Sequence, residues 1–255
     1  MKGRLSKEEA HSYWRQVHES ASDALAPVCF PTKSPFLNRF FDSMERRAVA
    51  RAVSATVGSV RGFSVLDIGS GRGRWLRFFQ RRGATAVGID FSDEAVRAAR
   101  NDGLDVRLAN AEDLPFDTAT FDLVVEVVVL LHLPPDGQRR AIAEMECVCK
   151  PGGWLLVLDI TGEDASPHVY PLALRDWIDL FDSCDLEYRE GHYFAWPLRA
   201  LWRLPLGRLP DRLVRLLENV AVAISIPLEL LLMRVFAGRS APGCLQHLLL
   251  FRKVA

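Results

Sequence analysis

The sequence carries no excess charge of either sign and no long apolar run. Its 32 lysines and arginines balance 32 aspartates and glutamates, so it lacks the basic surplus expected of a nucleic-acid-binding protein. No stretch reaches 18 uncharged apolar residues, and therefore no membrane-spanning helix is expected. The first residues, MKGRLSKEEAH, contain no apolar segment typical of a secretory signal. These absences predict a cytoplasmic protein that acts on no nucleic acid.

Cysteine is too sparse, and wrongly spaced, for a disulfide framework or a zinc site. The five cysteines are odd in number and form no C-x-x-C pair. This pattern favours reduced thiols and predicts no metal centre.

The most informative segment of the sequence is 64–73, SVLDIGSGRG. An apolar run there enters a turn with glycine at every second position, Gly69, Gly71 and Gly73, and a helix is expected to begin near Arg74. Glycines permit a sharp bend and close approach of a ligand. The unpaired N–H groups at the start of the helix would face that ligand. The pattern favours a nucleoside.

A second strand, 86–89, ends in Asp90, 19 residues after Gly71. An acid at this place in a doubly wound sheet binds ribose hydroxyls. The alternative is that Asp90 only starts the next helix, because Ser92 and two further acids follow it. A dinucleotide fingerprint would need glycine at 74, where this chain has Arg74. A nicotinamide-dependent oxidoreductase is therefore the weaker alternative.

The order D-x-G-x-G-x-G, which starts at Asp67, resembles the first motif of class I S-adenosylmethionine-dependent methyltransferases. Three later motifs, AEDLPF at 111–116, FD at 121–122 and CKPGG at 149–153, extend the resemblance. Together they are similar to the methyltransferase type 11 group, which includes quinone-biosynthesis C-methyltransferases. The resemblance covers about 64–160.

The resemblance implies S-adenosylmethionine as cofactor and S-adenosylhomocysteine as product, and it implies which residues bind them. The loop would hold the methionine part, one acid would hold the ribose, and three residues would surround the adenine. Asn110 departs from the group, which usually has aspartate there; its amide oxygen can still accept from the adenine amine. The cofactor set is Asp67, Gly69, Gly71 and Gly73 for the loop, Asp90 for the ribose, and Phe91, Asn110 and Ala111 for the adenine.

Two residues, one at the carboxyl end of the central strand and one just after it, are candidates for chemistry at the methyl group. Glu126 interrupts the apolar run 122–131 and would hold the acceptor, take its proton or pair with a buried arginine. His132 would act as a general base or cap the next helix. The expected reaction is methyl transfer to O or C of a small, fairly hydrophobic acceptor. A methyltransferase-like binding module without turnover is the alternative, supported only by two departures from the group: Asn110, and Leu131, where the group frequently has histidine.

The alternation of strands and helices predicts an α/β fold, a Rossmann-like, doubly wound, mostly parallel seven-stranded sheet. The resemblance implies that the last strand is antiparallel. An N-terminal helical cap and a helical insertion would be added to the sheet. Strands are expected at 64–68, 86–89, 106–109, 122–127, 154–159, 186–190 and 246–252. Helices are expected at 5–25, 36–57, 74–83, 92–103, 136–149 and 172–184.

The predicted units are a cap (1–60), a cofactor-binding core (61–191), an insertion (192–243) and a final core strand (244–255). In the cap, Tyr13 and Trp14 either close over the site or anchor the cap. Prolines are expected to cut the insertion into short helices, the longest at 211–226 and 228–237. We expect the insertion to be a lid over an apolar acceptor pocket, with peripheral membrane contact, homodimerisation or an internally packed cap as alternatives.

Overall fold

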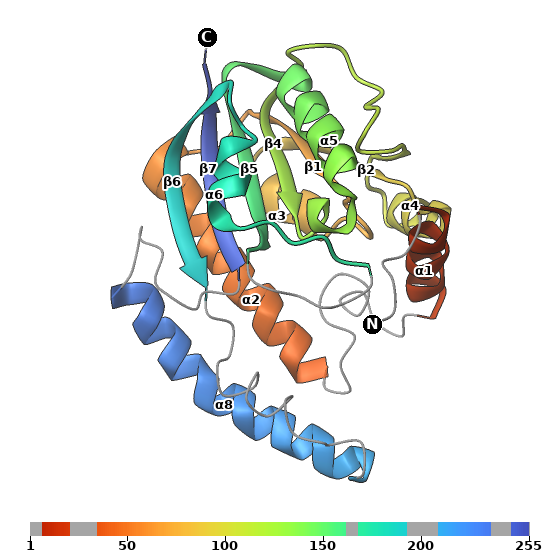
Figure 1. Cartoon of the computed structure of the whole chain (residues 1–255), viewed down its shortest axis with the longest axis vertical. Helices are drawn as coiled ribbons and strands as arrows, with labels where there is room; N and C mark the ends of the chain where they lie inside the picture. The colour runs from red at the N-terminus through yellow and green to blue at the C-terminus, as the bar shows by residue number, and fades with distance from the viewer. Residues whose placement is uncertain (1–6, 21–34, 162–167, 193–208, 236–245, 255) are drawn as a thin grey trace.

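The computed structural model describes residues 7–20, 35–161, 168–192 and 209–254. Its centre is one seven-stranded sheet of order β3-β2-β1-β4-β5-β7-β6, with β7 antiparallel to both of its neighbours (Figure 1). This confirms the predicted Rossmann-like sheet and its antiparallel last strand. The strands are β1 (Ser64–Ile68), β2 (Thr85–Asp90), β3 (Val106–Leu108), β4 (Phe121–Val127), β5 (Cys149–Ile160), β6 (Cys184–His192) and β7 (Gln246–Lys253).

Helices cover both faces of the sheet because its central strands are apolar on both sides. One apolar cluster joins the sheet to α2, α3 and α4, and the other joins it to α5 and α6. In β1 the side chains of Val65, Leu66 and Ile68 are fully buried. The helices are α1 (Lys7–Ser20), α2 (Pro35–Ala52), α3 (Arg74–Gln80), α4 (Asp93–Asn101), α5 (Pro135–Val148), α6 (Leu174–Asp179) and α8 (Asp211–Val235), with a π-turn at Val53–Val57 and a 3-10 turn, η2, at Leu130–His132.

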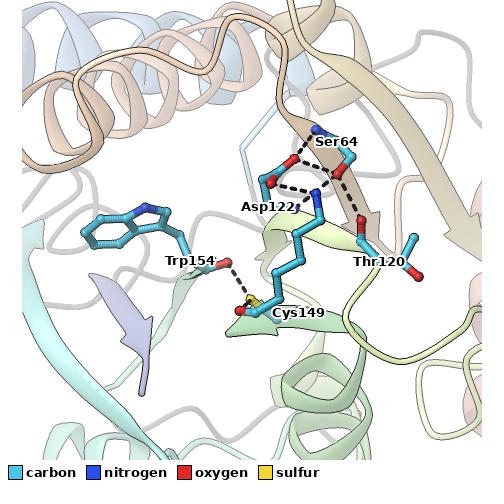
Figure 2. A network of polar contacts seen from close by, with 6 residues as sticks. Ser64, Thr120, Asp122, Cys149 and Trp154 are labelled. Carbon is cyan, nitrogen blue, oxygen red and sulfur yellow. Dashed lines mark hydrogen bonds and ion pairs between the residues drawn. The ribbon is translucent and has the colours of Figure 1, made fainter. Parts of the chain in front are cut away.

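A polar network ties the strands together at the amino edge of the sheet (Figure 2). Asp122 lies at its centre: Oδ2 accepts from the Ser64 backbone N–H at 2.8 Å, and Oδ1 accepts from Lys150 Nζ at 2.7 Å. Burial opposes ionisation of Asp122, but these hydrogen bonds outweigh burial and lower its pKa. The CKPGG turn therefore helps to hold β1, β4 and β5 in register, and it lies at the end of the sheet opposite the carboxyl ends of the parallel strands.

Polar residues gather instead at the carboxyl ends of the parallel strands. The register pairs Ile68 of β1 with both Ile89 of β2 and Glu126 of β4. Because parallel strands end at one edge, the loops that follow β1, β2 and β4 meet there. Ligands of doubly wound sheets bind at this edge.

The prediction that Pro227 divides two helices is wrong, because α8 is one helix with Pro227 inside it. Proline cannot donate the bond to the carbonyl of residue 223. Pro227 and Ala223 are both exposed, so water can satisfy that carbonyl and the helix continues.

Several predicted boundaries differ from the structure or fall outside it. The first predicted helix, 5–25, is described only over Lys7–Ser20, where it is helical. Helix α6 is shorter than 172–184, and β5 begins at Cys149 and includes the turn before residue 154. Residues 193–208 and 236–245, in the predicted insertion and its flank, lie outside the described residues. The lid over 192–243 therefore stays a prediction. No helix in the described ranges is long and apolar enough to cross a membrane.

Candidate active site

The loop after β1 is held tightly, and two of its glycines have no substitute. Gly69 has φ +63°, and a Cβ there would lie 2.5 Å from Cγ2 of Val129. Gly73 has φ +77°, and a Cβ there would collide with Leu104. L-residues with side chains rarely adopt such positive φ values. The glycine spacing therefore reflects both backbone conformation and close packing against the β4 turn and the end of α4.

Asp90 points into this loop, as the sequence predicted. Its Oδ2 accepts from the Gly71 N–H at 2.8 Å, and its Oδ1 accepts from the Ser92 N–H at 2.8 Å. Ser92, not Asp90, caps α4, because the Ser92 hydroxyl accepts from the Ala95 N–H. Asp90 therefore supports the glycine loop and the start of α4 at the same time.

Asp67 is a buried acid beneath the same loop. Its side chain is 1% exposed, and its Oδ2 has no hydrogen-bond partner. Burial raises the pKa of Asp67 well above its ordinary value, Asp90 and Glu126 raise it further, and Arg74 opposes the rise. The raised pKa favours the protonated, neutral form of Asp67, and a cationic group beside its unpartnered oxygen would favour the carboxylate instead.

An ion pair that the sequence did not predict holds the loop from the other side. Nη1 of Arg74, in the first turn of α3, lies 2.5 Å from Oε2 of Glu45 on α2, and both side chains are 7% exposed. Asp42 lies 3.4 Å from the same nitrogen. The pair fastens the N-terminal helical region to the start of α3. No local pattern indicates it, because 29 residues separate Arg74 from Glu45.

The predicted adenine-binding residues lie beside this loop, since the Ala109 N–H donates to the Asp90 carbonyl at 3.0 Å. Phe91 is 37% exposed, as a ring that stacks on a base requires. Asn110 Oδ1 accepts from the Glu112 N–H at 3.1 Å, and Ala111 packs against the core. The Asn110 amide oxygen is therefore already engaged in a local turn, which the sequence analysis did not foresee.

Glu126 is fully buried and points at backbone. Its Oε2 accepts from Val129 N at 3.1 Å and from Leu130 N at 3.4 Å. Burial raises its pKa, and nearby Asp159 raises it further. Burial likewise raises the pKa of Asp159 to about 8, and Asp159 Oδ2 accepts from the Leu131 N–H at 3.1 Å. The two acids together shape the turn after β4, where Val128 has φ +59°.

His132 lies in η2, under the first helix. Its Nδ1 is 3.0 Å from the His168 carbonyl oxygen, which can only accept, so Nδ1 is the donor in this hydrogen bond. The Trp14 ring lies edge-on at 4.6 Å from the His132 ring, and Tyr13 stacks on His168 at 4.6 Å. His132 does not cap α5, whose N-cap is Pro134.

Helix α1 lies beside α4 (Figure 1), and its Trp14 ring contacts the His132 ring. The two aromatic residues named from the sequence are both at the site. Their partner His168, like Asp159, was missed. Asp159 ends an apolar strand just as Glu126 does, and that shared pattern could have indicated it; His168 has no such signal.

The site fits the group that the sequence resemblance implies. S-adenosylmethionine carries a sulfonium and an ammonium, and the site offers a buried carboxyl oxygen without a partner on Asp67 together with Asp90. The glycine loop leaves its backbone close to any ligand because no side chain can occupy Gly69. No cluster of possible metal ligands occurs among the described residues.

Comparison with known proteins agrees with this geometry. Residues 66–157 match the family model described as "Methyltransferase domain". The "Probable tRNA methyltransferase 9B" of Mus musculus is 31% identical over 119 residues, 46% of this chain and 26% of that protein. The "Phosphatidylethanolamine N-methyltransferase" of Cereibacter sphaeroides is 34% identical over 130 residues, 48% of this chain and 60% of that protein.

Among solved structures, the [4+2]-cyclase SpnF shares the fold at a TM-score of 0.55 and 22% identity, with 82% of this chain and 81% of that chain covered. The chain spans less than two thirds of the length of either curated relative. The similarity therefore concerns the shared domain.

Proposed function

We propose that the chain is an S-adenosylmethionine-dependent methyltransferase of the class I, type 11 group, because residues 66–157 match a methyltransferase domain. It moves the methyl group by in-line displacement to O or C of a small, fairly hydrophobic acceptor. The observation that carries the proposal is the pairing of the Gly69–Gly73 loop with Asp90 and the buried, unpartnered Asp67 oxygen.

Each residue has a proposed part in binding. Gly69, Gly71 and Gly73 present backbone to the methionine part, and Asp67 faces its ammonium group. Asp90 accepts from the ribose, while Phe91 and the segment that contains Asn110 and Ala111 border the adenine. When bound, S-adenosylmethionine supplies an electrophilic methyl carbon on a sulfonium.

The chain contributes to the reaction mainly through alignment, exclusion of water and one base. Alignment of nucleophile, carbon and sulfur can supply much of the rate of such a displacement. Trp14 and Tyr13 on α1 shield the region above η2 from water. His132 Nε2 is the proposed proton acceptor, because Nδ1 is committed to the His168 carbonyl. Glu126 positions the turn that carries His132 and is not itself a proposed base, since it is fully buried.

The acceptor class is proposed from the surroundings of His132 and from the relatives. Apolar Val128, Leu131, Ile160 and Val169 form a cluster beside it. Similarity to a phosphatidylethanolamine N-methyltransferase supports an apolar or amphiphilic acceptor.

Similarity to a tRNA methyltransferase supports a second candidate acceptor, RNA. The chain has zero formal net charge, without the basic surplus of an RNA-binding protein. A third candidate is a module that binds the cofactor without methyl transfer, and the cyclase of the same fold supports it.

Calorimetry and a transfer assay test the proposal together. We expect wild-type protein to bind S-adenosylmethionine, Asp90→Ala to lose most of that affinity, and Asp185→Ala, an exposed acid on β6, to retain it. Tritiated methyl transfer is then measured to a phenol and quinone panel, to phospholipids and to tRNA. Absence of binding heat removes the enzyme proposal, and binding without transfer to any acceptor favours the binding module. Transfer to tRNA alone would replace the apolar acceptor.

A further inference from the structure

Asp67 is a buried carboxyl group whose Oδ2 atom has no hydrogen-bond partner among the described residues. Its side chain lies near the carboxyl end of β1 and is 1% exposed. Arg74, the cationic residue beside it, directs its Nη1 to Glu45 at 2.5 Å instead. A carboxylate is costly to bury without a cation or hydrogen bonds that satisfy it. The geometry therefore favours the neutral, protonated carboxyl at this position.

The acids around Asp67 reinforce this neutral state. The register pairs Asp67 with Gly88 of β2, and side chains alternate along a strand, so Asp67 and Asp90 lie on the same face of the sheet. Glu126 pairs with Ile68; it is fully buried, and its Oε1 has no partner among the described residues. Burial is the main cause of the raised pKa of Asp67, and Asp90 and Glu126 raise it further.

The other charged groups near this end of the sheet do not neutralise Asp67. They are the two acidic partners of Arg74 on α2, an acid on β5 and an arginine in the glycine loop: Asp42 and Glu45, Asp159, and Arg72. Arg74 is shared between the two α2 acids, at 2.5 and 3.4 Å. Asp159 raises the pKa of Glu126, and Arg72 is not among the groups that shift the pKa of Asp67. Of the described residues, therefore, only Arg74 offers positive charge to Asp67, and that charge is already paired.

We propose that Asp67 is protonated in the ligand-free protein and releases this proton when the ammonium group of the cofactor binds beside it, an inference that rests on the proposed function. The O–H bond of the carboxyl group breaks, the proton passes to solvent, and the carboxylate that remains pairs with the ammonium. A carboxyl group beside a cation has a lower pKa, so the complex holds fewer protons than its separate parts.

The consequence is a cofactor affinity that depends on pH. Because the complex holds fewer protons, the affinity rises as the pH rises. The rise is confined to the interval between the pKa of Asp67 in the complex and its higher pKa in the ligand-free protein, and for one proton it is at most about tenfold per pH unit. Above roughly pH 7.7 the ammonium of the ligand begins to lose its own proton, and the rise ends.

Calorimetry with S-adenosylhomocysteine measures the released proton. The full chain is titrated at several pH values between about 5 and 7, below the pKa of the ligand amine, in two buffers with different enthalpies of ionisation. The difference between the two apparent binding enthalpies, divided by the difference between the buffer enthalpies, gives the number of protons released. We expect a maximum that approaches one proton per ligand, and an affinity that increases over the same pH interval.

Two changes identify the source of the proton and the cause of its release. Asp67→Asn has nearly the same shape but no ionisable group, so it should bind the ligand without proton release and with a level affinity across this pH range. The deaminated analogue of S-adenosylhomocysteine keeps the carboxylate but lacks the ammonium, and wild type should bind it without proton release. Asp185→Asn, which changes an exposed acid on β6, is the matched control and should release the proton as wild type does.

The outcomes distinguish this inference from the proposed function. Absence of binding by wild type refutes both. Binding without proton release shows that Asp67 is ionised before the ligand binds, and it overturns the inference alone. Release that persists in Asp67→Asn, or that the deaminated analogue also causes, assigns the proton to another group and likewise overturns the inference. If Asp67→Asn does not fold, the comparison of the two ligands on wild type still decides.

Discussion

Replacement of Asp90 by Asn tests whether this acid binds a ribose hydroxyl or only supports the loop. In the structure its two oxygens accept from Gly71 N and Ser92 N, both at 2.8 Å. Asn has nearly the same shape but puts an NH₂ group where one acceptor stood, and it removes the charge. A ligand hydroxyl bound to a carboxylate contributes about 1.5–3 kcal/mol, which is about 10- to 150-fold in Kd.

The assay is a cycle in which protein and ligand are both changed. Calorimetry compares S-adenosylhomocysteine with its 2′-deoxy and 3′-deoxy analogues, on wild type and on Asp90→Asn. Wild type should lose about tenfold or more in affinity for at least one deoxy analogue. The variant should bind that analogue and the parent almost equally, because the partner of the hydroxyl is already lost.

The cycle distinguishes direct contact between Asp90 and the ribose hydroxyl from support of the glycine loop by Asp90. If Asp90 only holds the loop, Asp90→Asn weakens every ligand by the same factor, and the deoxy penalty is identical in both proteins. That result would refute ribose binding by Asp90. Asp185→Asn should show the wild-type penalty, and equal denaturation midpoints in the absence of ligand would show that the loop has kept its fold.

Three further predictions concern the frame of the site. Gly69→Ala should destabilise the protein by about 1–2 kcal/mol through its positive φ alone, and further through the clash of the new methyl group with Val129. Adding Val129→Ala should relieve only the clash, as measured by urea unfolding. Arg74→Met should cost about 3–5 kcal/mol by leaving Glu45 buried without its partner, whereas Arg74→Met/Glu45→Met should be close to wild type; an equally unstable double variant would contradict the buried pair. Burial raises the pKa of Asp159 to about 8 in the folded protein, so the native state binds a proton that the unfolded state releases. The urea midpoint should therefore decrease as the pH rises from about 4 to about 8. Asp159→Asn should weaken this dependence of the urea midpoint on pH, and an unchanged dependence would contradict the raised pKa of Asp159.

Local spacing was enough to predict the glycine turn and the acid beside it. Gly69, Gly71, Gly73 and Asp90 lie within two consecutive strand–turn units, where chain geometry limits the possible arrangements. The alternation of apolar strands with helices likewise predicted the layers of the fold. The antiparallel place of β7 came from family resemblance, because no local pattern specifies which strand a distant segment joins.

Side-chain direction at the ends of strands was harder to predict. Glu126 was correctly placed at the carboxyl end of β4, and its Oε2 accepts from the Val129 and Leu130 N–H groups, which the sequence did not predict. Asn110 is likewise engaged with its own turn. Both outcomes depend on where nearby backbone donors lie after the strand ends, and the residue type does not encode that.

The sequence by itself determined the glycine turn, the acid one strand away and the apolar strands that bring them together, since these depend on contacts between near neighbours along the chain. Only the tertiary structure decided that Arg74 pairs with Glu45, that Trp14 lies on His132, and that α8 passes through Pro227 as one helix with an exposed apolar side. Those features join segments far apart in sequence or depend on which side of a helix meets solvent, and packing of the whole chain sets both.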